Sequence, residues 1–474
     1  MVAVTDRVDL SLSDLGAKTI SFYNHLTNHY VPGPQSLSYL FSIILMPVAL
    51  LIPPSHLPHR LIRLVLLPTL YANLVHAWFA IGGLDVISMT VALWATVLLG
   101  IKDGRQFVRL RYRQTRPLFG AQSKVHHSQK SHQSNEHVGN DCLEEAYPMP
   151  LSKRLQWVLT LLTSLRLTDW RIGEERFDRK QLSGGMGKLR FARHATALIV
   201  FDFLLLDATF WYVRHDVYFI SPGMNIDEAF QNQDFQPAWV TILQVLPPRL
   251  VRCTVLAAQV FAMVSGMFYI PTLPAAALNA AGILADEWSP HAWPPFFGEF
   301  SAVTKRGLRG LWGDWWHQIN RMFVSMPARA LADALRLPRR SFIRYTMLVS
   351  TSFFLSGILH TGLVPPRPLT TNMTANGMRL CVASFFWVQA AGIAVECVVE
   401  SWVRRWIPDA IRGLPVRILV LLWVACWLSI CLPLLADPFR EIGYWHHSPV
   451  GSGILQPLCD VAGNQTRRVP QWPA

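Results

Sequence analysis

Residues 353–360 read Phe-Phe-Leu-Ser-Gly-Ile-Leu-His and form the core of an apolar stretch that extends over 341–363. A helix needs about 20 mainly apolar residues to cross a bilayer, so this stretch predicts a membrane span. Its one histidine, His360, would be costly inside lipid and therefore indicates a functional site. Ser356 precedes it by one helical turn on the same face, and Gly357 leaves room on that side. The alternative is a histidine at the membrane interface that is bonded to a backbone group.

The composition extends the membrane prediction to the whole chain. Of its 474 residues, 51% are hydrophobic and 15% are charged. Soluble proteins carry about 25% charged residues, so we expect an all-α, polytopic bundle with about eight spans and with re-entrant or interfacial helices. The apolar segment 272–285 is too short to span alone, and we expect it to form a re-entrant or interfacial helix. The expected spans are 36–53, 61–81, 84–100, 193–213, 250–270, 341–363, 378–400 and 415–436.

Polar stretches divide the chain into five expected parts. These are a polar N-terminal segment at 1–35, transmembrane helices at 36–100, a basic cytosolic loop at 101–192, a catalytic transmembrane core at 193–440 and a polar C-terminal tail at 441–474. The middle of the loop is rich in Ser, Gln and His, which is typical of a disordered linker. A metal site within that linker is the alternative.

The net charge of +13 comes from basic residues that lie between apolar runs. This is the pattern of cytosolic loops under the positive-inside rule, and no module for binding nucleic acid is visible. The seven cysteines contain no Cys-x-x-Cys pair, which predicts free thiols rather than disulfides or a zinc site.

The charge pattern also predicts the orientation of the chain. We expect the acidic loop 214–249 and the loop 364–377 in the lumen, and the basic region 284–340 in the cytosol. The sequons that begin at Asn372 and Asn464 then both lie on the lumenal side, which suits glycosylation. These features predict a multi-pass protein of the endoplasmic reticulum.

A second cluster of functional side chains precedes the histidine-bearing span. Residues 311–318 read Leu-Trp-Gly-Asp-Trp-Trp-His-Gln. In a helix, Asp314, His317 and Arg321 would share one face, bordered by the flat surfaces of tryptophans. The alternative is an interfacial amphipathic helix whose tryptophans form an aromatic belt.

The two clusters together resemble the wax-synthase-like branch of the membrane-bound O-acyltransferases. The resemblance rests on Trp-Gly-Asp-Trp-Trp-His-Gln at 312–318 and Leu-Ser-Gly-Ile-Leu-His at 355–360. The preceding Trp-Pro-Pro-Phe-Phe-Gly at 293–298 is similar to that of fungal members in particular. The first motif often ends in Asp-Trp-Trp-Asn in the wider superfamily, and His317 takes the place of the asparagine. Residues 1–190 carry little of the resemblance.

The resemblance implies acyl transfer from acyl-CoA to an alcohol, with His360 as the catalytic histidine. A positioned imidazole can remove the alcohol's proton as it attacks the thioester. His317, steadied by Asp314, would bind the carbonyl or the developing oxyanion, and an exchange of roles between the histidines stays open. The residues expected to contact substrate are Trp312, Trp316, Ser356 and Arg321.

The expected reaction needs no metal and no bound cofactor, since acyl-CoA is a co-substrate. Basic residues around 305–309 and 336–340 would attract its phosphates, or would merely set the topology. The acceptor is expected to reach the site through the membrane lipid. His317 lies at the expected cytosolic face and His360 toward the lumen, so the two meet only if 311–321 enters the membrane.

Fungal members of this branch resemble O-acetyltransferases that act in terpenoid and meroterpenoid pathways. We therefore expect transfer of acetyl from acetyl-CoA to a hydroxyl group of a hydrophobic secondary metabolite. A long-chain wax-ester synthase is one alternative. A non-enzymatic transporter that uses the histidines as a proton relay is another.

Overall fold

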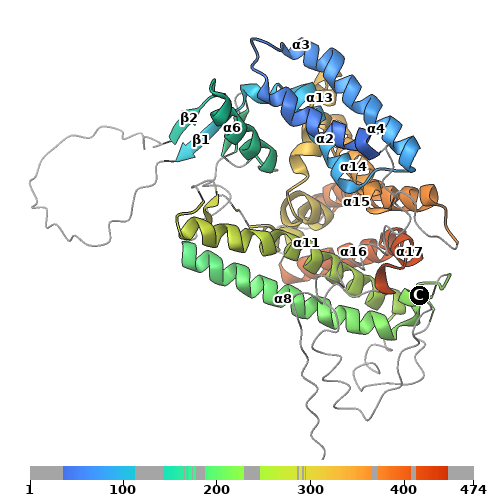
Figure 1. Ribbon diagram of the computed structural model, residues 1–474. Coiled ribbons are helices and arrows are strands. Elements are labelled where there is room, and N and C mark those ends of the chain that lie inside the picture. Colours follow the sequence, from blue (N-terminus) through green and yellow to red (C-terminus); the bar gives the residue numbers. More distant parts are fainter. Residues whose placement is uncertain are drawn as a thin grey trace, which may run out of the picture.

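Most of the described chain is helical in the computed structural model (Figure 1). The structure describes residues 36–112, 142–164, 166–167, 169–172, 175–177, 187–221, 223–228, 246–284, 288–290, 293, 295–365, 372–406 and 413–446. Six described helices are long and apolar enough to cross a membrane, namely His59–Phe79, Lys188–His215, Pro248–Ala280, Phe342–Leu363, Ala375–Trp402 and Leu414–Glu441. The other two expected spans correspond to shorter apolar helices, Phe41–Leu51 and Val86–Ile101. A multi-pass membrane architecture follows.

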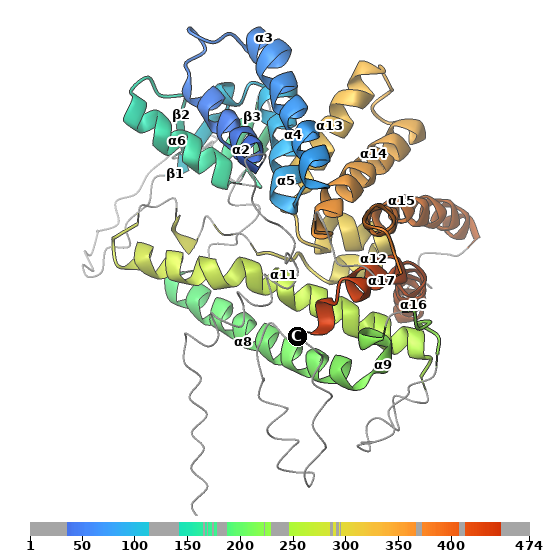
Figure 2. The ribbon, with the colours of Figure 1, turned by 45° about the vertical axis from the view of Figure 1, so that its right-hand side comes forward.

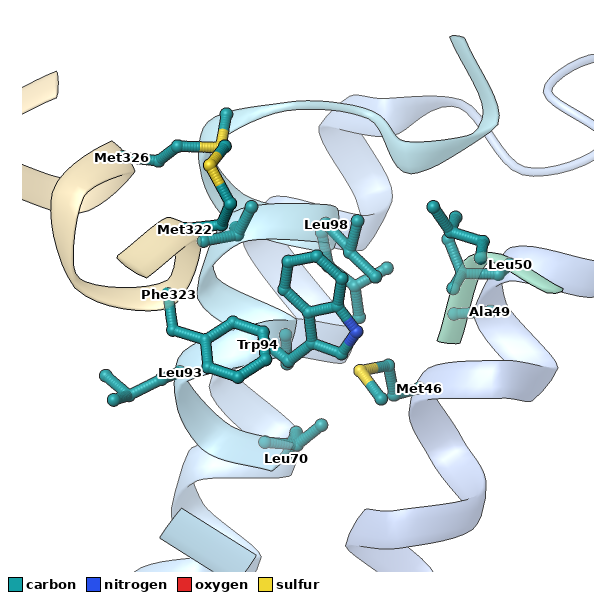
Figure 3. Close-up of a cluster of buried hydrophobic side chains, with 14 of the residues drawn as sticks. Met46, Ala49, Leu50, Leu70, Leu93, Trp94, Leu98, Met322, Phe323 and Met326 are labelled. Carbon is teal, nitrogen blue, oxygen red and sulfur yellow. The ribbon is translucent and has the colours of Figure 1, made fainter. Parts of the chain in front are cut away.

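The N-terminal helices form a layer at one end of the molecule. They are α2 (Ser36–Leu51), α3 (His59–Leu61), η1 (Ile62–Leu66), α4 (Leu67–Ile81), α5 (Val86–Ala95) and η2 (Thr96–Ile101). Figure 3 shows Trp94 of α5 at the centre of their core, with Met46 of α2 on one side and Phe323 on the other. Phe323 comes from the much later helix α13 (Arg321–Ala334), and its ring centroid lies 4.6 Å from that of Trp94. This contact ties the N-terminal layer to the segment that carries His317.

The expected loop 101–192 contains a small folded unit, so the all-α prediction is wrong here. Its antiparallel sheet has the strand order β2-β1-β3-β4. The elements are η3 (Gly104–Gln106), β1 (Val108–Tyr112), β2 (Cys142–Glu145), α6 (Leu151–Thr163), β3 (Trp170–Ile172) and β4 (Glu175–Phe177). Trp157 of α6 packs edge-on against Trp170 of β3, with ring centroids 4.9 Å apart. The expected linker in the middle of the loop lies outside the described residues.

Two long helices lie side by side along one edge of the molecule (Figure 1, Figure 2). They are α8 (Lys188–His215), which is followed by α9 (Val217–Ile220), and α11 (Pro248–Ala280). A buried pair joins their ends, because Arg252 donates two 2.8 Å hydrogen bonds to Asp216. Helix α11 continues through two prolines to Ala280, so the separate re-entrant helix expected at 272–285 is not formed.

The remaining helices surround the site. They are α12 (Ser301–Gly310), η6 (Leu311–Trp315), α13, α14 (Phe342–His360), η7 (Thr361–Leu363), α15 (Ala375–Trp406), α16 (Leu414–Cys431), α17 (Pro433–Glu441) and η9 (Tyr444–His446). Helices α14 and α15 cross closely at Gly357. A Cβ atom at this glycine would lie 2.5 Å from Nε1 of Trp387 and 2.9 Å from the carbonyl oxygen of Ala383. The glycine therefore sets how closely His360 approaches α15.

Candidate active site

The segment around His317 is not the continuous helix that its spacing predicts. The π-helical turn η6 ends at Trp315, and Trp316 is extended, with φ −61° and ψ 149°. The Gln318 side chain donates a 2.6 Å hydrogen bond to the Trp316 carbonyl, and a new helix begins at Arg321. A side chain of the turn thus satisfies the backbone carbonyl of Trp316 in the same turn. It also separates the three side chains that were expected on one helix face.

Asp314 does not steady His317. Its carboxylate forms an ion pair with Arg306, and no hydrogen bond or ion pair joins it to the His317 side chain. The reason is the extended conformation of Trp316, which turns the two side chains away from a common face. Asp314 therefore holds the preceding helix against the turn, through Arg306.

The element Trp-Pro-Pro-Phe-Phe-Gly docks directly onto this turn. The Gly298 amide donates a 2.8 Å hydrogen bond to the Trp315 carbonyl. A Cβ atom at Gly298 would collide with the carbonyl oxygen of Asp314, so glycine is required for this close approach. Phe297 stacks on Trp315 with ring centroids 5.4 Å apart. The two motifs are thus one structural unit.

His317 lies in an aromatic environment and carries an unpartnered nitrogen. Its ring stacks on Phe296 at 5.5 Å and is tilted against Trp316 at 5.3 Å. Its Nδ1 atom is buried and has no hydrogen-bond partner among the described residues. Burial, followed by electrostatic repulsion from His360 and Arg166, lowers the pKa of His317 from 6.5 to about 3. The ring is neutral near pH 7, with one N–H donor and one lone pair.

His360 is the last residue of α14, and a backbone contact fixes its tautomer. Its Nδ1 lies 2.7 Å from the carbonyl oxygen of Ser356 and 3.5 Å from the Ser356 hydroxyl. A carbonyl only accepts, so Nδ1 carries the hydrogen and Nε2 carries the lone pair. Phe386 of α15 stacks on the imidazole with centroids 4.0 Å apart. The backbone bond that we expected for a histidine at the membrane interface is therefore present. The same bond leaves the lone pair on Nε2, so this nitrogen can accept a proton.

Trp312 connects the two histidines. Its ring lies 5.9 Å from that of Trp316, which touches His317, and 6.5 Å from that of Phe386, which stacks on His360. Its indole N–H donates a 3.2 Å hydrogen bond to Oε1 of Gln389, a fully buried residue of α15. The segment around Trp312 therefore enters the helical bundle. This is the geometry that we expected to be necessary for the two histidines to lie at one site.

One residue that supports the site, Glu396, was missed by the sequence reasoning. Glu396 of α15 accepts hydrogen bonds of 2.9 and 3.0 Å from the amides of Leu308 and Arg309. These amides follow Gly307, whose φ of 56° breaks α12 just before the tryptophan-rich turn. The only signal in the sequence was a carboxylate within an apolar helix. Its partners could not be predicted, because they are backbone groups exposed by the break in the helix.

The other expected site residues occupy less central positions. Arg321 is exposed, and its Nη1 donates a 3.1 Å hydrogen bond to Oε1 of Gln318. The side chain of Asn372 is exposed, while its backbone amide donates a 3.1 Å hydrogen bond to Glu441. Asn464 lies outside the described residues.

Residues 293–369 match the family described as "Membrane bound O-acyl transferase family". This segment is similar to the membrane-bound O-acyltransferases. It contains both histidines and the Trp-Pro-Pro-Phe-Phe-Gly element, so the resemblance inferred from those motifs is confirmed.

Curated fungal acetyltransferases are distant relatives of the chain. Acetyltransferase aurG of Calcarisporium arbuscula is 32% identical over 35% of this chain and 38% of its own length. Acetyltransferase atnC of Arthrinium sp is 32% identical over 35% of this chain and 37% of its own length. Acetyltransferase nanB of Aspergillus nanangensis is 27% identical over 54% of this chain and 57% of its own length. The chain thus spans 37% to 57% of the length of these relatives. No solved structure matches it.

Proposed function

We propose that the protein transfers an acetyl group from acetyl-CoA to a hydroxyl group of a hydrophobic terpenoid or meroterpenoid. One observation carries the proposal. A histidine with a free Nε2 lone pair and a neutral histidine with an unpartnered Nδ1 lie on one aromatic cluster, within the membrane-bound O-acyltransferase segment. The relatives named as acetyltransferases support the choice of acetyl as the acyl group.

His360 acts as the general base in this proposal. The bond from Nδ1–H to the Ser356 carbonyl orients the ring and directs Nε2 toward the hydroxyl group of the acceptor. The hydroxyl proton moves to Nε2 while the oxygen forms a bond to the thioester carbon. Assistance of this kind accelerates reactions about 10²–10⁴-fold.

His317 stabilises the oxyanion in this proposal. Addition of the alcohol moves an electron pair onto the carbonyl oxygen, and a neutral imidazole N–H can donate a hydrogen bond to it. Collapse of the intermediate breaks the carbon–sulfur bond, and the thiolate of CoA takes the proton from His360. The products are an ester and CoA thiol, so the step balances without a metal or bound cofactor.

The aromatic surroundings suit a hydrophobic acceptor. Trp312 and Trp316 form the surface between the two histidines and would contact the acceptor and the acetyl group. Helices that are long and apolar enough to cross a membrane surround this cluster, which suits an alcohol that partitions into lipid. We place the protein in the endoplasmic reticulum, with acyl-CoA reaching the site from the cytosol.

The test uses microsomes that contain the full chain. They are supplied with labelled acetyl-CoA and a panel of terpenoid alcohols, and with long-chain acyl-CoA in parallel. We expect labelled ester from acetyl-CoA, and its loss in His360→Ala at an equal level of membrane-inserted protein. Full transfer by His360→Ala, or no ester with any alcohol, would overturn the proposal. Transfer from long-chain donors alone would establish the wax-ester alternative.

A further inference from the structure

Two of the arginines expected to attract the acyl donor, at 305–309, are already paired. Arg306 forms an ion pair with Asp314, and Arg309 with Glu400. Their charges are neutralised within the protein, where they hold α12 against η6 and α15. A phosphate site directly beside His317 would therefore use other arginines.

Arg166 approaches the site from the folded N-terminal unit. It lies in the turn between α6 and β3, and its Nη1 donates a 2.8 Å hydrogen bond to the carbonyl oxygen of Pro295. The next residue, Phe296, stacks on His317. The residue after Arg166, Leu167, is fully buried and adopts a positive φ of 50°. Arg166 therefore lies beside the site.

Arg321 follows His317 closely in the sequence, at the start of α13. It is bonded to Gln318, which in turn is bonded to the Trp316 carbonyl. Within the described residues, neither Arg166 nor Arg321 forms an ion pair with a carboxylate. Burial, followed by the charge of Arg321, lowers the pKa of Arg166 to about 10. Both guanidinium groups therefore stay charged near pH 7 and act on each other electrostatically, with no carboxylate partner among the described residues.

We propose that Arg166 and Arg321 form the binding site for the phosphate groups of the acyl-CoA donor. The inference rests on the proposed acyl transfer. A bound phosphate would supply the missing negative charge, and guanidinium groups match phosphate oxygens in charge and geometry. Arg166 contacts the residue before Phe296, which stacks on His317, and Arg321 contacts Gln318, the residue after His317, so phosphates held there would place the thioester end near His317. The N-terminal unit then selects the donor for a reaction carried out by the later helices.

A binding experiment tests the site without any acyl transfer. The probe is adenosine 3′,5′-bisphosphate, titrated into the purified full-length protein in detergent. Arg166→Gln keeps an N–H group for the Pro295 carbonyl and removes the charge, while Arg321→Gln removes the second charge. We expect each variant to weaken binding roughly tenfold, the scale of one charge-assisted hydrogen bond. Arg417→Gln, an exposed arginine at the start of α16 and outside the basic groups expected to attract phosphate, is the matched control and should bind as the unaltered protein does.

Kinetics with two donors form the second arm. S-acetylpantetheine carries the thioester but lacks the phosphates. Arg166→Gln and Arg321→Gln should lower kcat/KM for acetyl-CoA, mainly through KM, at least severalfold more than for S-acetylpantetheine. Equal losses with both donors, or unchanged binding of the bisphosphate, would overturn the inference. If the bisphosphate binds as described and no acetyl transfer is seen, the phosphate site stands and the proposed reaction fails.

Discussion

At the scale of single residues, the two histidines differ in what fixes them. A backbone carbonyl holds Nδ1 of His360, whereas aromatic rings surround His317 and leave its Nδ1 unpartnered. The backbone bond of His360 leaves a lone pair on Nε2, which makes this nitrogen a proton acceptor. The arrangement at His317 keeps a neutral ring whose Nδ1 atom has no partner among the residues that the structure describes. This difference is why we assign the base to His360 and the oxyanion contact to His317.

The backbone bond of His360 predicts a contrast between two substitutions. His360→Ala should lower kcat about 10²–10⁴-fold, the usual contribution of a general base. Ser356→Ala removes a hydroxyl that lies 3.5 Å from Nδ1 but keeps the 2.7 Å bond to the carbonyl, so it should change kcat only a few-fold. Steady-state kinetics in microsomes measure both. A loss in Ser356→Ala as large as that in His360→Ala would show that the hydroxyl, and not the carbonyl, orients the ring.

The depressed pKa of His317 predicts how stability depends on pH. In the unfolded chain, His317 becomes protonated as the pH falls below its ordinary pKa of 6.5. In the folded protein its pKa is about 3, so it stays neutral to a much lower pH. The unfolded state therefore binds more protons in this window, and stability falls as the pH is lowered through it. Between about pH 6 and 5 the loss from this one residue should be about 1 kcal/mol.

His317→Gln removes that titration and serves as the comparison. The unfolding midpoint of the detergent-solubilised protein should fall less between these two pH values in the variant than in the unaltered protein. Identical pH profiles would mean that His317 is solvated or paired in the folded state.

Sequence reasoning predicted the contacts of His360 better than those of His317. The position of His360 in an apolar stretch and the helical spacing from Ser356 were enough to predict their contact. The pairing of Asp314 with His317 was wrong, because it assumed a continuous helix. The break at Trp316 depends on docking of the Trp-Pro-Pro-Phe-Phe-Gly element, which is a tertiary contact that residue spacing does not encode.

At the scale of elements, the π-helical turn is held by contacts with two other segments. Gly298 approaches its backbone from one side, and Glu396 caps the broken helix before it. These contacts place Trp312 and His317 on the same cluster as His360. The turn is therefore a supported element whose position determines the geometry of the site.

Two glycines test this support. Gly298→Ala should force the Asp314 carbonyl aside, displace His317 and lower kcat at least tenfold, while the protein still inserts into membranes. Gly313→Ala is the matched control, because a Cβ atom there meets nothing within 4 Å and activity should be retained. Microsomal kinetics at equal protein levels provide the measurement. Equal activity of the two variants would show that the close approach at Gly298 does not position the site.

The elements that were not foreseen lie outside the long apolar spans, and they include short strands as well as the helices α6 and α13. The strands of the N-terminal unit have three to five residues, and they lie in a polar stretch that reads as a loop. Strands of this length carry too few alternating positions to give a recognisable period. The long apolar helices were foreseen, because hydropathy over about 20 residues is a strong signal.

At the scale of the whole molecule, the N-terminal layer supports a site that lies mostly in later helices. The family match begins at residue 293, yet Phe323 of α13 is fully buried against Trp94 of α5. The site segment immediately precedes α13. The N-terminal helices therefore fix one end of that segment, and the helices after it fix the other.

Removing that anchor should affect stability and activity together. Phe323→Ala should destabilise the protein by about 3–5 kcal/mol, the usual cost of truncating a buried phenylalanine, and should lower kcat. Leu331→Ala is the control on the same helix, since Leu331 is 42% exposed and should change little. Thermal unfolding in detergent and microsomal kinetics check the two effects. Unaltered kcat in a destabilised Phe323→Ala protein would separate the N-terminal layer from the site.

The central claim is that His317 and His360 act on one reaction, and a double-mutant cycle in kcat/KM tests it most directly. Residues that act as a unit are strongly non-additive. Microsomes carrying His317→Ala, His360→Ala and both changes are compared under identical donor and acceptor concentrations. We predict that the double variant loses little more activity than His360→Ala alone. Losses that multiply, or full activity in either single variant, would contradict a shared site.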